Sequence, residues 1–216
     1  MTSYDAFLPR ILIDAYGCPE IVAVQAIRDS VIEFCVRSNF IQRDHDPITA
    51  VAGISDYDLE PPNGQLVIKI QKCWFKASEL SPIAPDYVAT PAFYNSGIPE
   101  NAPLLATPLS FTQKDERTFS IYPIPKDTVV NALTLRISLK PTRASTNCET
   151  SIYEDYAEVI AHGALSKLLA SPGKAYMNVA AAGMHGAAFN SGINEARQRA
   201  SRGHVRSGMQ VRMRKI

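Results

Sequence analysis

Features that mark several specialised classes of protein are scarce or missing in this chain of 216 residues. The segment 1–10 has no basic stretch followed by a long apolar run, which predicts neither a signal peptide nor a targeting helix. No other stretch reads as a membrane span. The cysteines are widely spaced and form no C-x-x-C pair, so we expect reduced structural thiols in a protein that folds in a cytoplasm. They are Cys18, Cys35, Cys73 and Cys148.

Sequence patterns for catalysis are missing as well. The segment Ser171–Lys174 lacks the first glycine and the final Ser or Thr of the phosphate-binding pattern G-x-x-x-x-G-K-S/T. There is no G-x-S-x-G elbow, and no cysteine has basic or histidine-rich neighbours. Glu154, Asp155 and Glu158 gather at an expected helix start, where the helix dipole favours carboxylates without any chemistry. The sequence therefore predicts no enzyme activity, no catalytic residue and no cofactor.

Histidines and carboxylates are too poorly spaced to predict a metal site. Asp44, His45 and Asp46 are adjacent, and adjacent side chains rarely converge on one ion, so we expect a solvated polar loop there. His162 and His185 fall in expected helices without a ligand residue four positions on, as a helical zinc pair needs. Each is interpreted as a packed or surface histidine, and no bound metal is expected.

Charge is unevenly distributed along a chain whose net charge is only +1. The segment Arg197–Ile216 holds seven Lys and Arg residues and no acidic residue, which leaves roughly six net negative charges on the remainder. Such segregation is typical of a basic arm that docks on an acidic or negatively lined partner. The chain is 46% hydrophobic, which suffices for a substantial core.

Proline separates a β-rich centre from helical ends, because twelve of the fifteen prolines lie between Pro47 and Pro141. Apolar spacing and capping residues predict helices in both flanking parts, the third of them opened by an S-x-x-E capping box at Ser151 and Glu154. The expected helices are Asp5–Ala15, Pro19–Ser38, Ser151–Leu169 and Asn178–Ala200.

The centre has the period of two that is typical of half-buried strands, most plainly over Leu133–Lys140. Weaker strands are expected at Tyr57–Leu59, Leu66–Trp74 and Phe119–Ile121, paired antiparallel, and Ser81–Pro108 reads as an irregular loop. The predicted fold is α+β: a helical bundle from both chain ends with an inserted, antiparallel, sandwich-like β domain. We expect the bundle at 1–40 and 148–200, the β domain at 41–147 and a basic C-terminal arm at 201–216.

The last helix carries a heptad seam of unusually small residues. The seam is Val179, Ala182, Gly186, Phe189, Ile193, Ala196 and Ala200. Gly183, Gly186 and Gly192 each cost this helix about 1 kcal/mol relative to alanine. Close packing must offset that cost, and the sequence leaves open whether the neighbour belongs to the same subunit or to another.

Two stretches resemble the head-to-tail connector, or adaptor, proteins of tailed bacteriophages, also described as tail tubular protein A-like. Near the N-terminus the resemblance rests on Leu8-Pro9-Arg10, Gly17-Cys18-Pro19, Ala26-Ile27-Arg28-Asp29 and Glu33-Phe34-Cys35. Near the C-terminus it rests on Gly163-Ala164, Leu168-Leu169, Pro172-Gly173-Lys174, Asn178 and Phe189-x-x-Gly192-Ile193. Tyr176 stands where the family pattern has Trp. The match covers roughly the first forty and the last seventy residues, and the β region agrees in layout only.

The resemblance implies a structural virion protein at the head-tail junction, made in the host bacterial cytoplasm. It implies a dodecameric ring under the portal, which extends the DNA channel and is the platform for the next tail component, a nozzle, tail tube or stopper. Genomic DNA would pass through during ejection without sequence-specific binding, and neither a membrane nor a catalytic residue is involved. A stopper with the same bundle is the nearest rival within this class of virion parts.

The basic arm is our candidate for portal docking, with positive charges and apolar anchors interleaved. Its residues are Arg202, Arg206, Met209, Val211, Arg212, Met213, Arg214, Lys215 and Ile216. The alternative function is nucleic-acid binding through this tail, since Lys and Arg neutralise phosphates. Stacking platforms for single strands need aromatic residues, however, and none follows Phe189.

Overall fold

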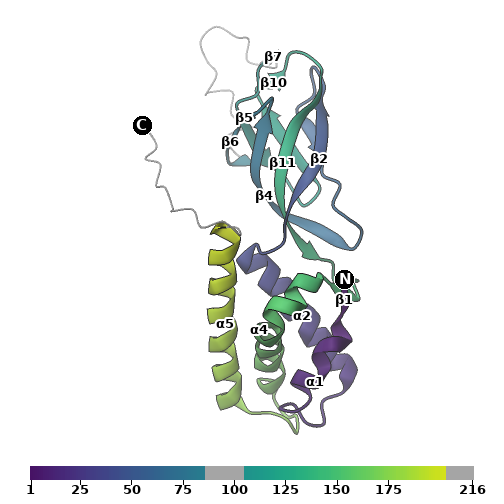
Figure 1. Cartoon of the computed structure of the whole chain (residues 1–216), viewed down its shortest axis with the longest axis vertical. Coiled ribbons are helices and arrows are strands. Elements are labelled where there is room, and N and C mark those ends of the chain that lie inside the picture. The colour runs from purple at the N-terminus through teal and green to yellow at the C-terminus, as the bar shows by residue number, and fades with distance from the viewer. Residues whose placement is uncertain (86–104, 203–216) are drawn as a thin grey trace. The chain divides into compact units, whose positions relative to one another are not determined.

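The computed structural model describes residues 1–85 and 105–202 (Figure 1). Its internal contacts define two compact units, one formed by Met1–Ile41 with Pro141–Ile216 and one by Gln42–Lys140. Helices from both chain ends make the first unit and strands make the second, so the predicted α+β class with a β-rich insertion is confirmed. No helix within the described ranges is both long and apolar enough to cross a membrane.

The first helical segment of the helical unit is shorter than predicted. Strand β1 (Thr2–Ser3) pairs antiparallel with β12 (Asn147–Cys148), a 3-10 turn follows at Tyr4–Phe7, and α1 spans only Leu8–Ile11. Pro9 lies in the first turn of α1, where its missing N–H costs no hydrogen bond. Tyr4, Phe7 and Ile11 are buried, so packing rather than helix length fixes this segment.

Helix α2 (Glu20–Ser38) confirms the prediction closely. Pro19 is its N-cap, and Asn39 ends it in the left-handed conformation (φ 51°) with its N–H donating to the Cys35 carbonyl at 2.9 Å. The periodic residues Ile27, Val31 and Phe34 are fully buried.

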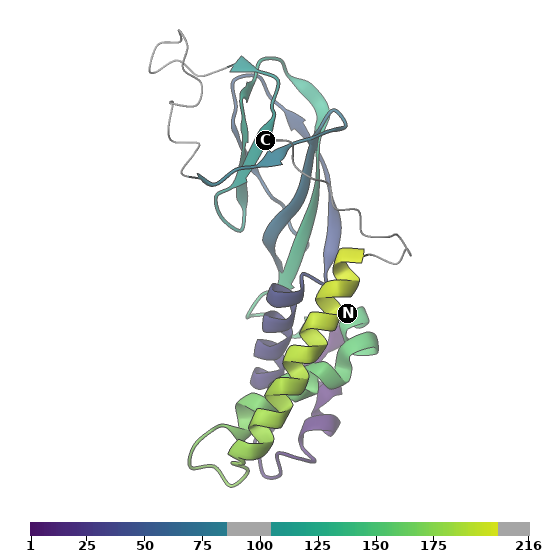
Figure 2. The same ribbon diagram turned by 90° about the vertical axis from the view of Figure 1, so that its left-hand side faces the viewer.

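Two further helices complete the unit, α4 (Thr150–Leu169) and α5 (Val179–Arg202), and α2, α4 and α5 lie side by side (Figures 1 and 2). The expected capping box of Ser151 and Glu154 is wrong, because α4 begins earlier with Glu149 as N-cap and Ser151 lies inside the helix. A kink at Tyr156 (φ −134°) was not predicted either. Its ring packs against Phe34 and Phe40, with centroids 5.0 and 4.9 Å away, so tertiary contacts accompany the kink where no proline does.

The β unit contains two four-stranded sheets, ordered β2-β11-β4-β5 and β3-β9-β8-β6. The first consists of β2 (Gln42–Ala50), β4 (Gln65–Phe75), β5 (Ser78–Glu79) and β11 (Val129–Pro141). The second consists of β3 (Asp56–Asp58), β6 (Ser81–Pro82), β8 (Ser110–Gln113) and β9 (Thr118–Tyr122). The Ile70 N–H of the first sheet donates to Gln113 Oε1 of the second at 2.8 Å.

Strand β11 confirms the alternation read from the sequence. Leu133, Leu135, Ile137 and Leu139 are at most 2% exposed, while Thr134 and Arg136 face solvent. Ser138 departs from the alternation, because it is fully buried. Together with Val67 and Cys73 of β4 and Phe119 and Ile121 of β9, the four apolar side chains form the buried core of this unit. The chain forms strands here because the apolar residues recur at the period of the pleat.

Pairing in the β unit is mostly antiparallel, as expected, but two short pairs are parallel: β6 with β8, and β7 (Leu105–Ala106) with β10 (Ile124–Pro125). The irregular segment expected over 81–108 lies largely outside the described residues, and its described ends form β6 and β7.

The interpretation of Asp44, His45 and Asp46 as a solvated loop is wrong, since all three lie in β2. Asp44 Oδ1 is 2.9 Å from Arg136 Nε on β11, and His45 Nε2 accepts the Glu60 N–H at 3.1 Å. Strand β2 is at the edge of its sheet, where Pro47 is tolerated. Pairing with β11 overrides the local polarity that predicted a loop.

Candidate functional site: the α4–α5 helix pair

Helices α4 and α5 pack unusually closely because glycine stands at two contact points. An ideal Cβ built on Gly163 of α4 would lie 2.8–2.9 Å from the Phe189 ring, and one on Gly192 of α5 would lie 2.5 Å from Val159 Cγ2. Both distances are shorter than carbon atoms tolerate. The glycines are therefore needed for this approach, and the chain itself supplies the neighbour.

The predicted seam residues of α5 divide into two groups. Ala182, Phe189, Ile193 and Ala196 are buried, Gly186 and Ala200 are half-buried, and Val179 is 65% exposed. The structure thus brings the central residues together against α4 and leaves the first one in solvent. The remaining glycines differ from Gly192, since Cβ atoms there would meet nothing within 4 Å at Gly183 and only Ser166 Cβ at 3.8 Å at Gly186.

Large apolar side chains stay exposed around the first half of α5 and around the α1–α2 connection. The α1–α2 and α4–α5 connections lie at the same end of the helical unit (Figures 1 and 2). The exposed set is Ile13 (79%), Tyr16 (86%), Ile21 (80%), Val179 (65%) and Met184 (76%). Clustered exposed apolar groups are typical of protein–protein contact surfaces.

A polar network ties α2, α4 and α5 together. Lys167 Nζ of α4 is 2.9 Å from Glu33 Oε2 of α2 and donates to Ser30 Oγ at 3.1 Å. Arg37 donates to Glu33 Oε1 at 2.9 Å and to Asn190 Oδ1 of α5 at 2.7 Å. Partial burial alone raises the pKa of Glu33, but the hydrogen bonds from Lys167 and Arg37 outweigh it and hold that pKa below its usual value. The sequence did not signal the contacts that join this network across helices, because Lys167 and Asn190 are far from α2 in the chain.

Three residues on the solvent-facing side of α4, here called the α4 row, contact neighbouring helices: Asp155, Glu158 and His162. Asp155 Oδ2 is 3.3 Å from Arg199 Nη2 of α5, and Glu158 Oε1 is 3.5 Å from Arg10 Nη1 of α1. One turn further on, His162 Nδ1 is 2.8 Å from His185 Nδ1 of α5. Both histidines were predicted to be packed or surface residues, and the contact between them was missed.

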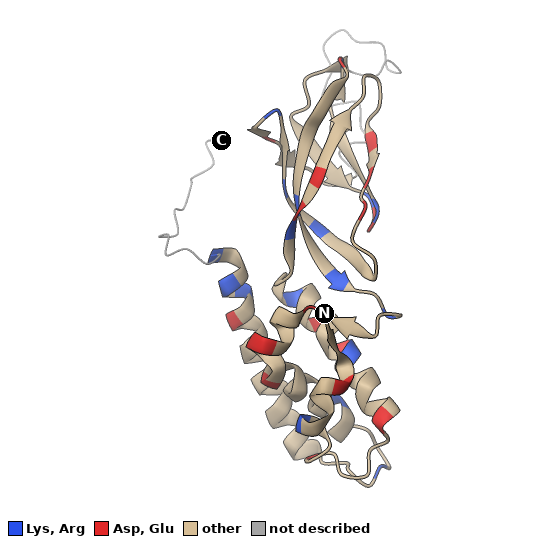
Figure 3. Cartoon of the chain, turned by 45° about the vertical axis from the view of Figure 1, so that its right-hand side comes forward, with Lys and Arg blue, Asp and Glu red and all other residues tan. Residues whose placement is uncertain are grey.

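The C-terminal end of α5 is basic, with Arg199 and Arg202 in its last turn (Figure 3). Of the proposed docking arm only Arg202 is described, and it is exposed. The remaining arm residues, Arg206, Met209, Val211, Arg212, Met213, Arg214, Lys215 and Ile216, lie outside the described residues.

The cysteines occur as buried free thiols, in agreement with the prediction. Burial raises the pKa of the Cys35, Cys73 and Cys148 thiols, that of Cys73 to about 12 and that of Cys148 to about 11. Such thiols stay protonated and unreactive near neutral pH. Within the described ranges, no group of three or more His, Cys, Asp or Glu side chains is arranged to hold a metal ion.

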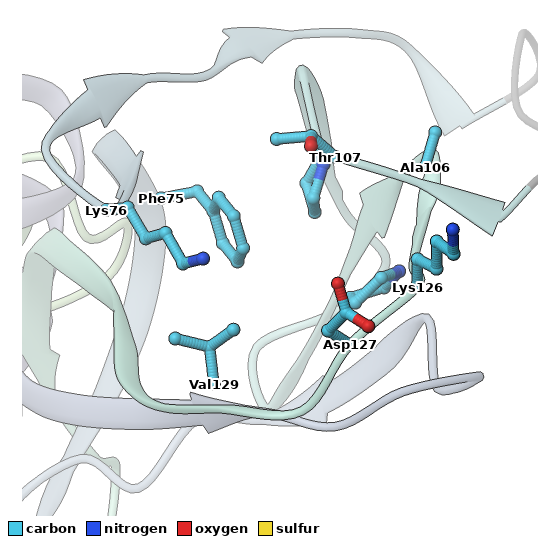
Figure 4. Close-up of a pocket in the computed structure, with 9 residues that line it drawn as sticks. Phe75, Lys76, Ala106, Thr107, Lys126, Asp127 and Val129 are labelled. Atoms are coloured by element: carbon cyan, nitrogen blue, oxygen red, sulfur yellow. The ribbon is translucent and has the colours of Figure 1, made fainter.

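A surface hollow of about 320 Å³ lies in the β unit (Figure 4). Phe75 and Val129 line it with apolar surface, and Lys76, Lys126 and Asp127 are its charged lining residues. Its nine lining residues include no histidine, cysteine or serine.

The chain combines a helical unit made from both chain ends, an inserted β unit and exposed apolar side chains on the helical unit, which is the layout that the resemblance to adaptor proteins implies. A family model described as SU10 adaptor protein matches residues 4–214, almost the whole chain. The chain belongs to the SU10 adaptor protein family. This match confirms the resemblance to phage head-to-tail adaptors. No curated protein matches the chain.

Proposed function

We propose that this protein assembles into a ring, a dodecamer as the resemblance implies, under the portal of a tailed phage. The ring extends the DNA channel and is the platform on which the next tail component assembles. The observation that carries this proposal is the adaptor family match over residues 4–214, together with the helical unit and β-rich insertion that the resemblance implies. The role is structural and needs neither catalytic residue nor cofactor.

Self-assembly is supported by the apolar surface that the helical unit leaves exposed. Ile13, Tyr16, Val179 and Met184 are each at least 65% exposed, although the unit has a well-filled core. A closed ring needs two different surfaces on each subunit, because every contact is heterologous and the rotation must close. Burial of such side chains between copies stabilises the ring by about 25 cal/mol per Å² of apolar area.

Attachment to the portal is assigned to the basic arm that follows α5. Arg202 begins it at an exposed position, and its positive charges suit an acidic or negatively lined partner. Charge-assisted hydrogen bonds and the apolar anchors Met209, Val211 and Met213 would together hold the arm on the portal.

The decisive experiment is sedimentation of the purified chain, alone and mixed with cognate portal rings, in moderate and in high salt. We expect a portal complex with many copies of the chain that survives high salt. If the chain does not bind the portal at any salt concentration, the adaptor role is refuted.

Truncation after Ala200 tests the docking arm. It removes only the last two described residues of α5, so we expect unchanged helical content together with loss of portal binding. Two full-length controls separate charge from apolar anchoring: one replaces the arm's Arg and Lys by Gln, the other replaces Met209, Val211 and Met213 by Ser. If the truncated chain binds the portal as well as the full-length chain does, the arm is not part of the interface.

Nucleic-acid binding remains the second candidate, favoured by the exposed Arg197, Arg199 and Arg202 at the end of α5. Phosphate binding weakens steeply with salt, because bound counterions are released on association. A salt titration with duplex and single-stranded DNA separates the two functions. Tight binding at low salt with a steep slope supports this candidate, and weak binding at every salt concentration removes it.

A further inference from the structure

The contact between His162 on α4 and His185 on α5 has no role in the proposed adaptor function. Their Nδ1 atoms are 2.8 Å apart and their ring centroids 5.0 Å apart. Because the centroids are much further apart than the nitrogens, the two rings point at each other through Nδ1. Each nitrogen is therefore the hydrogen-bond partner of the other.

A metal ion does not explain this geometry. Two imidazoles that hold one ion direct their lone pairs at a common third point, about 2.0–2.1 Å from each nitrogen for zinc. Here the nitrogens face one another at hydrogen-bond distance, and no third ligand completes a metal group among the described residues. The contact is a direct imidazole–imidazole hydrogen bond.

Such a bond requires one Nδ1 that carries a proton and one that does not. It forms when both rings are neutral or when only one is charged. When both rings are protonated, both Nδ1 atoms are donors, the hydrogen bond is lost and two positive charges are held in contact. Histidine is the side chain that makes this change between about pH 5 and 8.

The pair lies beside one of the two close glycine contacts between the helices. His162 precedes Gly163, whose absent Cβ makes room for the Phe189 ring, and Phe189 is one helical turn after His185. A repulsion at the pair therefore acts beside one of the two glycine contacts that hold α4 and α5 close together. The other two cross-helix contacts of the α4 row, Asp155–Arg199 and Glu158–Arg10, are ion pairs that involve no histidine.

The surroundings of His162 favour its neutral form. Burial lowers the pKa of His162, and repulsion by His185 lowers it further. Glu158 of α4 and Asp14 after α1 act in the opposite direction, but they do not cancel these effects. On α2, Glu33 is paired with Lys167 and Arg37.

We propose that the His162–His185 pair is a pH-sensitive latch between α4 and α5, closed by a hydrogen bond at neutral pH and opened by protonation of both rings. The unfolded chain binds a proton at His162 more readily than the folded chain does, since the folded-state pKa of His162 is lowered. Stability from the latch is therefore complete above the ordinary histidine range and is lost as the pH falls through it. This property is independent of ring formation and of portal binding.

The test compares denaturant unfolding of the full-length chain at about pH 7.5 and about pH 5.5, which bracket the ordinary histidine pKa. Far-ultraviolet circular dichroism follows the helical unit, while fluorescence of Trp74, the single tryptophan, follows the β unit. The variants are His162→Gln, His185→Gln and the double variant, because glutamine keeps a hydrogen-bonding group but does not titrate. The matched control is His45→Gln in β2.

From about pH 7.5 to about pH 5.5, the folded-to-unfolded ratio of the helical unit should fall about twofold to tenfold more in the wild type than in the double variant. The effect is no larger because solvent screening limits repulsion at half-exposed sites. The His45→Gln control should behave like the wild type in the helical signal. Equal pH dependence in the wild type and the double variant would overturn the latch.

A titration of the wild-type imidazoles by NMR keeps the proposal testable even if the variants fold poorly. Two interacting rings release their protons in two coupled steps that belong to the pair. We expect the His162 signal to follow two such steps and to change when His185 titrates. Independent one-step titrations of His162 and His185 would contradict a shared proton.

Discussion

Small residues have different roles in the two halves of α5. From Phe189 to Ala196 the helix is pressed against α4, and Gly192 is required because a Cβ there would meet Val159 at 2.5 Å. From Val179 to Gly186 the helix faces solvent more widely, and at Gly183 a Cβ would meet nothing within 4 Å. One sequence pattern thus covers two structural situations.

This difference shows which glycines are accounted for by packing within a single chain. Each glycine inside a helix costs about 1 kcal/mol relative to alanine, a cost that close packing offsets at Gly192. No packing within the described chain offsets it at Gly183. The exposed half also carries Val179 and Met184, which points to contacts made only in an assembly, as the proposed ring requires.

The largest expected effect comes from Phe189→Ala in the packed half. Phe189 is 3% exposed and fills the space above Gly163, so the substitution leaves a cavity and should cost about 3–5 kcal/mol. Denaturant unfolding followed by circular dichroism measures it. The matched control, Val179→Ala in the exposed half, should change stability by at most about 0.5 kcal/mol. Similar losses in both variants would refute the distinction between the halves.

A smaller loss is expected for Gly192→Ala. Alanine improves helix propensity, but the new Cβ overlaps Val159 on a packed helix, so we expect a net loss of about 1–3 kcal/mol. The double variant Gly192→Ala with Val159→Ala removes the overlapping methyl groups and should recover part of the loss. Thermal melts of the two proteins check this, and the absence of any recovery would mean that the helices separate instead.

The network at Glu33 should contribute about 0.5–1 kcal/mol, a value limited by solvent because this side chain is 36% exposed. The folded-state pKa of Glu33 is lowered, so its stabilisation is present above the unfolded-state pKa and is lost as the pH falls through the folded-state value. Glu33→Gln should therefore be less stable than wild type near neutral pH, and the gap should close in acid. Unfolding free energies measured from about pH 7 to about pH 3 test this, and a gap that persists in acid contradicts the ion pair.

Periodicity predicted the regular elements well, since α2 and β11 each bury one side. Their apolar residues recur at the period of the element and meet the core that the rest of the chain provides. Prediction failed where distant partners decide the local structure. Asp44 and its neighbours read as a loop, yet pairing with β11 makes them a strand, and the capping pattern at Ser151 is overridden by an earlier helix start at Glu149.

The candidate site was predictable only in part, for the same reason. The heptad seam located Phe189 and Ile193 on the packed side of α5, but it did not identify Val159 and Gly163 as their neighbours. The histidine pair joins positions 23 residues apart, and the bond from Lys167 to Ser30 joins positions 137 apart. No local spacing encodes such contacts, which arise only when α2, α4 and α5 are brought side by side.

The smallest effect on stability, and one of opposite sign, is expected for Gly183→Ala. The added methyl group meets open space, so the isolated chain should gain up to about 1 kcal/mol from improved helix propensity. If the exposed half of α5 receives a second copy at close range, the same methyl group must weaken assembly. Unfolding of the monomer and sedimentation of the portal-bound ring, measured on one variant, therefore give opposite changes. A variant that is more stable and also assembles normally would show that Gly183 faces solvent in the ring, and would move the copy-to-copy contact elsewhere on the helical unit.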